Sequence, residues 1–269
     1  MKNYFFIIAL LATVHSNAQE LFVYTEPASN MPAKTIGLRL SQYFMPDKYH
    51  GTTNYHLLPE IMFGINKNLM VHVEGFLSNR NRSLAYEGFS LYGKYRFFSK
   101  DDVHTHFRMA GFAKISYNNS DIHQDVIDIN GHNSGYNLGI IATQLLHKVA
   151  LSSSISYIRA TDNGSNNKYP FSQANEGVNY TVSFGKLLLP KEYTNYNQTN
   201  LNFMLEFLGQ KLVGNNKSYL DIAPSLQLII HSQTRVDIGY RQELYSNLLR
   251  TAPNGFQIRV EHLLFNVFK

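Results

Sequence analysis

Residues 219–245 read YLDIAPSLQLIIHSQTRVDIGYRQELY, and this stretch decides the fold. In its second half the charged residues Arg235 and Asp237 alternate with the apolar residues Val236 and Ile238. Successive side chains of a β-strand point to opposite faces, so a period of two predicts a strand with one polar and one apolar face. The stretch therefore predicts two such strands joined by a tight turn.

Segments of the same kind follow one another from residue 34 onward. None of them keeps the three-four spacing of an amphipathic helix, so the chain is predicted to be all-β. We expect about twelve strands. Their predicted bounds are 35–44, 55–65, 69–77, 89–98, 103–117, 136–147, 149–159, 178–188, 201–210, 219–231, 234–245 and 256–268.

Short and long connections alternate along the chain. The short ones are residues 66–68, 99–102, 147–148 and 232–233, which are rich in residues that suit hairpin turns. The longer polar ones are residues 45–54, 78–88, 118–134, 160–177, 213–218 and 246–255. The connection 189–198 is longer than the pattern predicts, and nothing in the sequence explains its length. The pattern is typical of a barrel that has its turns at one end and its loops at the other.

Composition excludes several classes of protein. The 269 residues are 44 % hydrophobic and only 16 % charged, against about 25 % charged in an average soluble protein. Since there is no cysteine, a disulfide framework, a cysteine zinc site, a thiol nucleophile and a lipidated cysteine are all excluded. The formal charge of +5 is spread along the chain without a Lys/Arg run, so no nucleic-acid partner is predicted.

The charged residues of the predicted strands gather on the face opposite the apolar one. They are Arg39, Glu60, Glu74, Lys94, Arg96, Arg108, Lys114, Glu206, Asp221, Arg235, Asp237, Arg241, Glu243, Arg259 and Glu261. A membrane explains this exclusion, because Arg or Lys on the lipid face at mid-bilayer costs about 2–4 kcal/mol. Predicted strands of about ten to twelve residues also exceed the usual five or six of soluble sandwiches. We therefore predict a transmembrane antiparallel β-barrel of about twelve strands, an even number as in bacterial outer-membrane barrels.

The first 18 residues are predicted to be a signal peptide. An apolar stretch, residues 4–14, follows Lys2, and Ser16 and Ala18 are the small residues that a signal peptidase reads. Cleavage near Ala18 and the barrel pattern together predict the outer membrane of a Gram-negative cell. Residues 34–269 are then the barrel. Residues 19–33 are most simply a periplasmic linker, and a partial plug that tucks inward is the alternative.

Several segments resemble an uncharacterised group of Bacteroidota outer-membrane proteins. They are LFVYTEPASNMPAK (residues 21–34), PEIMFGI (59–65), LYGKYRF (91–97) and APSLQ (223–227). That group is loosely similar to the barrel family named after the meta-pathway of phenol degradation. The resemblance implies a transporter-like barrel and implies neither a substrate nor a catalytic residue. The partners to expect are outer-membrane lipid, an unknown small solute, and the barrel-assembly machinery during insertion.

The charged face is predicted to line the lumen, with His72, His104 and His106 on the same face. This lining predicts a channel or transport-associated protein for an unidentified small solute, with the charges as its selectivity lining. Twelve strands lie between the filled barrels of eight strands and the open channels of sixteen. The alternative is therefore a structural or interaction barrel whose lumen is closed by salt bridges and whose external loops carry the role.

Two further kinds of chemistry have weaker signals. Residues 121–132 combine carboxylates and imidazoles that suit a divalent cation, but no calcium-loop or His-Glu-x-x-His pattern occurs, so no metal or other cofactor is predicted. A membrane-embedded hydrolase is the third hypothesis for function. The serines Ser152-Ser153-Ser154 have only His147 near them in sequence and no Gly-x-Ser-x-Gly motif. No catalytic residue is therefore assigned, and the protein is not predicted to be an enzyme.

Overall fold

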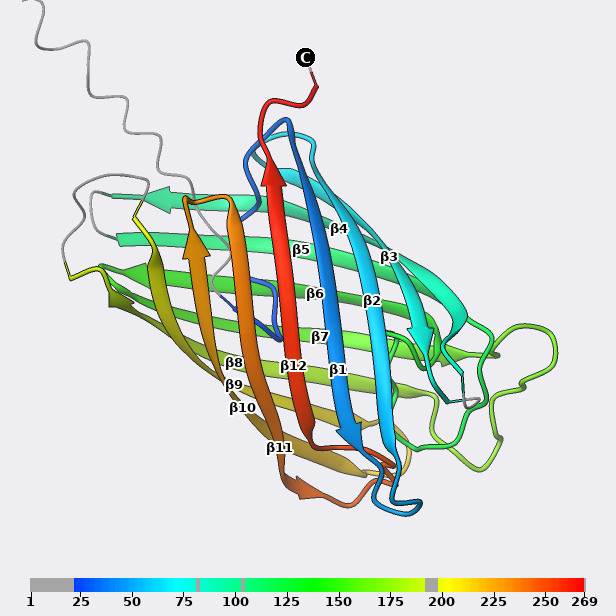
Figure 1. Cartoon of the computed structure of the whole chain (residues 1–269). Coiled ribbons are helices and arrows are strands. Elements are labelled where there is room, and N and C mark those ends of the chain that lie inside the picture. The colour runs from blue at the N-terminus through cyan, green and yellow to red at the C-terminus, as the bar shows by residue number, and fades with distance from the viewer. Residues whose placement is uncertain (1–21, 81–82, 103–104, 192–197, 269) are drawn as a thin grey trace, which may run out of the picture.

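The structure is a computed structural model that describes residues 22–80, 83–102, 105–191 and 198–268. Within these residues twelve antiparallel strands form one closed barrel, as predicted (Figure 1). Each strand pairs with its neighbours in sequence, and β1 pairs with β12 to close the barrel. The strands are β1 (Thr35–Pro46), β2 (Thr53–Gly64), β3 (Leu69–Ser78), β4 (Ala85–Asp101), β5 (Thr105–Asn118), β6 (Ser134–Leu146), β7 (Val149–Thr161), β8 (Glu176–Leu189), β9 (Asn200–Leu212), β10 (Ser218–Ile230), β11 (Thr234–Ser246) and β12 (Gly255–Leu264).

The predicted strand bounds lie within a few residues of the observed ones, except at the end of the chain. There the prediction of a strand to residue 268 is wrong, since β12 stops at Leu264. Leu264 pairs with Ile36 near the start of β1, so the residues that follow have no strand to pair with. Asn266 then takes a φ of 55°, and the nitrogen of Val267 donates a hydrogen bond to the oxygen of Lys34 at 3.0 Å.

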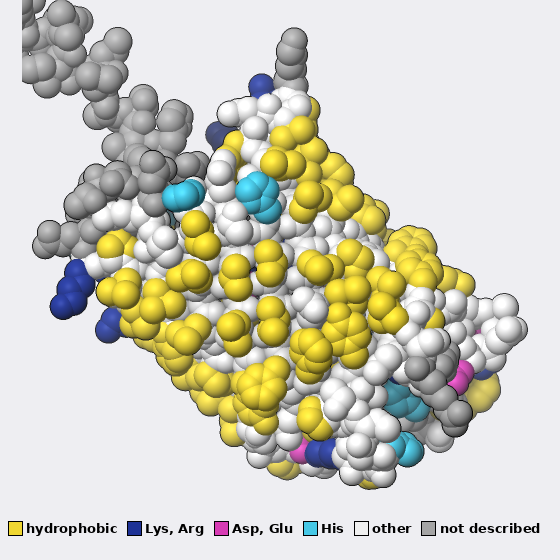
Figure 2. All heavy atoms as spheres, in the orientation of Figure 1, with side chains coloured by type: hydrophobic (Ala, Val, Ile, Leu, Met, Phe, Trp, Pro, Cys, Tyr) yellow, Lys and Arg dark blue, Asp and Glu magenta, His cyan; other side chains and the backbone are white. Residues whose placement is uncertain are grey.

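The outward face of the barrel is apolar along the middle of the strands. Exposed side chains there include Leu38, Ile115, Leu138, Ile140, Ile155, Val182 and Ile238. On the face shown in Figure 2, apolar side chains cover the strands while Lys, Arg, Asp and Glu lie toward the two ends. An apolar band of this extent around a closed barrel suits lipid rather than water. Among the described residues no helix is long and apolar enough to cross a bilayer.

The two ends of the barrel differ in their connections. Residues 65–68, 147–148 and 231–233 are short turns at one end, which we call the turn end (Figure 1). Residues 119–133 and 162–175 are the longest loops at the opposite end, the loop end. Part of the unexplained connection 189–198 lies outside the described residues. The predicted signal peptide and His104 lie entirely outside them.

Two segments outside the strands lie inside the barrel. The first, residues 22–33, occupies the lumen toward the turn end, and we call it the inner segment. Phe22 is 1 % exposed and Ala28 is fully buried, although neither belongs to a strand. The second, residues 119–133 between β5 and β6, folds inward from the loop end, and we call it the roof loop. Its Val126, Ile127 and Ile129 are buried.

Candidate functional site

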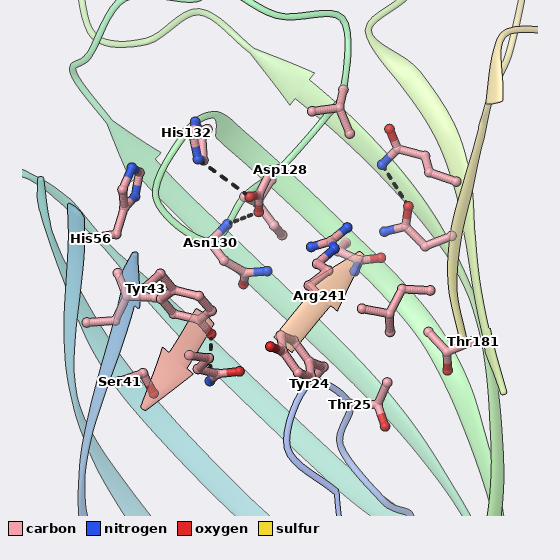
Figure 3. Close-up of a pocket in the computed structure, with 18 of the residues that line it drawn as sticks. Tyr24, Thr25, Ser41, Tyr43, His56, Asp128, Asn130, His132, Thr181 and Arg241 are labelled. Atoms are coloured by element: carbon pink, nitrogen blue, oxygen red, sulfur yellow. Dashed lines mark hydrogen bonds and ion pairs between the residues drawn. The ribbon is translucent and has the colours of Figure 1, made fainter. Parts of the chain in front are cut away.

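A chamber of about 360 Å³ lies in the lumen between the inner segment and the roof loop. Tyr24 and Thr25 of the inner segment lie on one side of it, and Asp128, Asn130 and His132 of the roof loop on the other (Figure 3). Inward-facing side chains of the strands complete the wall. The volume is at the lower end of the range for small-molecule pockets, about 300–1,000 Å³.

The floor of the chamber is fixed to the wall through the backbone of the inner segment. Glu206 on β9 accepts hydrogen bonds from the backbone nitrogens of Val23 and Tyr24 at 2.9 Å and of Thr25 at 2.8 Å. Lys94 on β4 donates to the carbonyl oxygen of Pro27 at 2.6 Å. An irregular segment inside a barrel needs such partners, because its backbone groups cannot join a ladder. The wall residues therefore determine where the floor lies.

A network of ion pairs joins the floor to the wall. Arg39 on β1 contacts Glu26 of the inner segment at 3.3 Å, Glu60 on β2 at 2.9 Å and Glu261 on β12 at 2.7 Å. The network extends through Arg235 and Asp237 on β11 to Arg259 on β12, and it includes His72, whose Nδ1 lies 2.6 Å from Glu60 Oε1. Arg259 in turn donates to the backbone oxygens of Phe22 and Val23, both at 2.8 Å. Most lumen charges are thus paired with one another rather than facing an open gap.

A second ion-pair group lies nearer the loop end. Asp221 on β10 is fully buried and contacts Arg241 on β11 at 2.6 Å and Arg250 of the β11–β12 loop at 2.7 Å. The guanidinium of Arg250 also lies over the ring of Tyr219, 4.1 Å from its centroid, and 3.2 Å from Glu243. The loop is therefore attached to the barrel wall at this point.

The roof loop is held from two sides. Gln210 on β9 exchanges hydrogen bonds with both backbone groups of Ile127, at 3.0 Å and 2.8 Å. On the opposite side His132 stacks on His56 of β2 with ring centroids 4.8 Å apart, and Arg80 contacts His132 Nδ1 at 2.5 Å. Burial, and then the charge of Arg80, hold the pKa of His132 well below its ordinary value of 6.5. A neutral imidazole is therefore the form that accepts the Arg80 contact.

Among the described residues, one wall of the chamber carries no charge. The side chains of β6, β7 and β8 that line it are Asn137, Ser154, Ser156, Asn179 and Thr181, which are small and polar, and the apolar Ile141 and Ile158. Ser154 and Thr181 face each other across the β7–β8 pair, with their hydroxyl oxygens 2.7 Å apart. The alternation of serines in residues 152–156 thus places hydroxyl groups inside the barrel.

The structure places the sequence-predicted lumen residues that it describes on the inward side of the strands. Those that line the chamber are Arg39, Glu60, His72, Glu74, Lys114, Arg241 and Arg259. Lys94, Glu206, Asp221, Arg235, Asp237, Glu243 and Glu261 lie in the ion-pair groups or against the inner segment. Arg96, His106 and Arg108 lie near the turn end, where Arg96 contacts the oxygen of Lys67 and the other two contact Asp101.

The residues that sequence patterning missed lie outside the strands. Glu26 and Tyr24 belong to the inner segment, Arg250 to a loop and Asp128 to the roof loop. Alternation assigns a face only to a strand residue, so it carries no signal for these four. Within the strands, Tyr43 of β1 also lines the chamber, and Gln257 donates a hydrogen bond to its hydroxyl at 3.0 Å.

Two segments gave weaker sequence signals, residues 121–132 for a metal ion and residues 152–154 for a nucleophile. No group of three or more His, Asp or Glu side chains among the described residues is arranged to hold a metal ion. Within residues 121–132, Asp125 instead pairs with Lys217 at 2.6 Å. Ser152 shares a hydrogen bond with Thr143 on the neighbouring strand β6 at 2.8 Å.

The fold is similar to that of solved outer-membrane channels. An outer membrane channel from Pseudomonas putida F1 matches with a TM-score of 0.57 and 10 % sequence identity, covering 90 % of this chain and 99 % of that chain. The NanC porin matches with a TM-score of 0.51 and 11 % identity, covering 86 % of this chain and 98 % of that chain. At such low identity the likeness shows the fold alone.

No protein-family model and no curated protein matches the sequence. The resemblance to the meta-pathway barrels therefore stays a prediction. The chain has the fold of an outer-membrane porin-like barrel, and the solved structures that it resembles are called porins and channels rather than enzymes.

Proposed function

We propose that this protein is an outer-membrane channel that holds a small solute in its chamber, with the inner segment closing the turn end until it is displaced. The observation that carries the proposal is the chamber itself, about 360 Å³ of space bounded by two segments that are not part of the wall. Because side-chain contacts rather than strand pairing hold both segments, either can move without opening the barrel. In this proposal lipid covers the outward apolar band, and the barrel-assembly machinery inserts the chain.

A second candidate is a barrel that conducts nothing and acts through its external loops. The observation in its favour is the ion-pair network between Arg39, Glu26, Glu60 and Glu261, which fills lumen space with paired charges. Under this candidate the inner segment is a permanent plug.

Conductance in a planar bilayer separates the two candidates. The mature protein, residues 19–269, is compared with a variant that lacks residues 19–33. If the channel proposal is right, the mature protein opens rarely and the shortened variant conducts steadily. If the shortened variant folds into a heat-modifiable barrel in detergent and still conducts no small ion, the channel proposal is wrong and the second candidate stands.

A further inference from the structure

The cations that line the chamber already have partners. Each of the described ones has a carboxylate within ion-pair distance, namely Arg39 with Glu261 at 2.7 Å, Lys114 with Glu74 at 2.8 Å, Arg241 with Asp221 at 2.6 Å, Arg250 with Asp221 at 2.7 Å and Arg259 with Asp237 at 2.6 Å. An anion that entered would lose its hydration and would meet cations that are already compensated. The chamber therefore disfavours an anion.

The uncharged wall offers groups that match hydroxyls. Ser156 can donate and accept a hydrogen bond, and the Ser154–Thr181 pair, whose hydroxyls share one hydrogen bond, still offers one O–H donor and acceptor oxygens. Beside them the side-chain oxygen of Asn137 is buried and has no hydrogen-bond partner among the described residues. A buried polar atom of this kind is costly to leave unpaired, so it favours a ligand that donates a hydrogen bond.

Two tyrosine rings lie across the chamber from this wall. In the view of Figure 3, Tyr24 lies between Tyr43 and Thr181. The hydroxyl of Tyr24 and the side-chain oxygen of Gln257 are buried and without a partner among the described residues. A tyrosine ring supplies an apolar face together with a polar tip. This side thus suits a solute with both C–H surface and hydroxyl groups.

We infer that the chamber takes an uncharged polyhydroxylated solute of the size of a monosaccharide or a sugar alcohol. The inference rests on the proposed function, since it names the class of solute for the same chamber. The solute's hydroxyls pair with the serine and threonine hydroxyls and with the orphaned oxygens of Asn137 and Gln257. Its C–H faces lie against the rings of Tyr24 and Tyr43.

Three probes that share a six-carbon polyol chain and differ in charge test this class. They are sorbitol, which is neutral, gluconate, an anion, and N-methylglucamine, a cation. Permeation into liposomes is measured with the mature protein and with Glu206→Gln, which weakens the floor, and binding to the mature protein in detergent is measured by calorimetry. We expect sorbitol to permeate and bind at least about tenfold better than either ion, because burial removes the hydration of both ions.

A variant series locates the contact. Thr181→Val removes one hydroxyl at nearly constant shape and is expected to weaken sorbitol binding about fivefold, and Thr181→Ser is expected to restore it. Thr161→Val is the matched control, since Thr161 is exposed on the outer surface of β7. Gluconate binding that equals or exceeds sorbitol binding, and that is lost in Arg241→Gln, overturns the inference in favour of an anion site.

The outcomes also separate this inference from the proposed function. If no probe permeates through any form of the protein, the channel proposal fails, while the calorimetry still decides the class of ligand. If gluconate permeates as fast as sorbitol, the channel proposal stands and the inference is wrong.

Discussion

Glu206 in the barrel wall holds Thr25 of the inner segment, with the carboxylate Oε2 2.8 Å from the backbone nitrogen of Thr25. The other oxygen of the same carboxylate accepts the amides of Val23 and Tyr24, and Glu206 has no exposed surface. Hydrogen bonds to an ionised acceptor are about twice as strong as neutral ones. One wall side chain thus fixes three consecutive residues of the floor, and displacing the floor requires its release.

We expect Glu206→Gln to loosen the inner segment. The amide accepts through one oxygen only and carries no charge, so it cannot replace the three contacts. In planar bilayers the variant should open at least about tenfold more often than the mature protein, which corresponds to about 1.4 kcal/mol. Glu176→Gln, on the exposed ion pair with Arg159, is the control and should leave the openings unchanged. Equal opening in the two variants would mean that Glu206 does not hold the floor.

Arg39→Ala is expected to destabilise the barrel strongly. The substitution leaves Glu26, Glu60 and Glu261 without the cation they share, and removing one partner from a buried ion pair costs about 3–5 kcal/mol. Urea unfolding in lipid vesicles gives the free energy of unfolding. Arg159→Ala, which breaks an exposed pair on the outer surface, should leave that free energy nearly unchanged. Similar losses in the two variants would contradict the network's role.

The architecture was predictable because one physical constraint acts on every strand. Lipid outside and polar groups inside impose the same period of two from residue 35 to residue 264, so Arg235 and Arg39 reveal their face by their position alone. The end of the last strand was not predictable. It depends on where β1 begins, and the apolar residues after Leu264 continue the pattern without a partner strand.

Acid is expected to loosen the roof loop. The pKa of His132 lies well below 6.5 in the folded protein, because the imidazole is buried and faces Arg80. The free loop therefore binds the proton more readily than the closed one, and closure weakens as the pH falls below about 6.5. The charged and titratable groups around the ring are Arg80, His56, His123, Asp128 and Arg241.

Hydrogen exchange of residues 119–133 near pH 8 and near pH 5, corrected for the intrinsic rates, measures this loosening. His132→Gln removes the titrating group and should flatten the dependence on pH. A dependence that survives in His132→Gln would assign the effect to another group.

The outward face predicts where a charge is least tolerated. Ile140 lies near the middle of β6 and is 50 % exposed. If lipid surrounds it, Ile140→Arg should cost about 2–4 kcal/mol of folding free energy in vesicles. Phe171→Arg, in the β7–β8 loop, should have no comparable effect because that side chain is fully exposed beyond the strands. Equal tolerance of the two substitutions would mean that Ile140 does not face lipid.

The candidate site was predictable in its wall and not in its floor or roof. Alternation assigned Arg39 and Asp221 to the inward face, but their ion-pair partners include Glu26 and Arg250, which lie in irregular segments with no period to interpret. The backbone amides of Val23 and Tyr24 donate hydrogen bonds to the buried carboxylate of Glu206. No sequence pattern predicts these contacts, because every residue except proline has a backbone amide. Contacts between a strand and an irregular segment depend on the three-dimensional path of the chain.

A reversible lock on the inner segment tests the central claim most directly. Thr25 and Ser183 on β8 have hydroxyl oxygens 2.9 Å apart, and the chain has no native cysteine, so T25C/S183C introduces a single disulfide between floor and wall. If the inner segment must move for solute to pass, the oxidised variant should be closed in a planar bilayer, and a reductant should restore openings like those of T25C alone. Conductance that is the same before and after reduction would contradict the account.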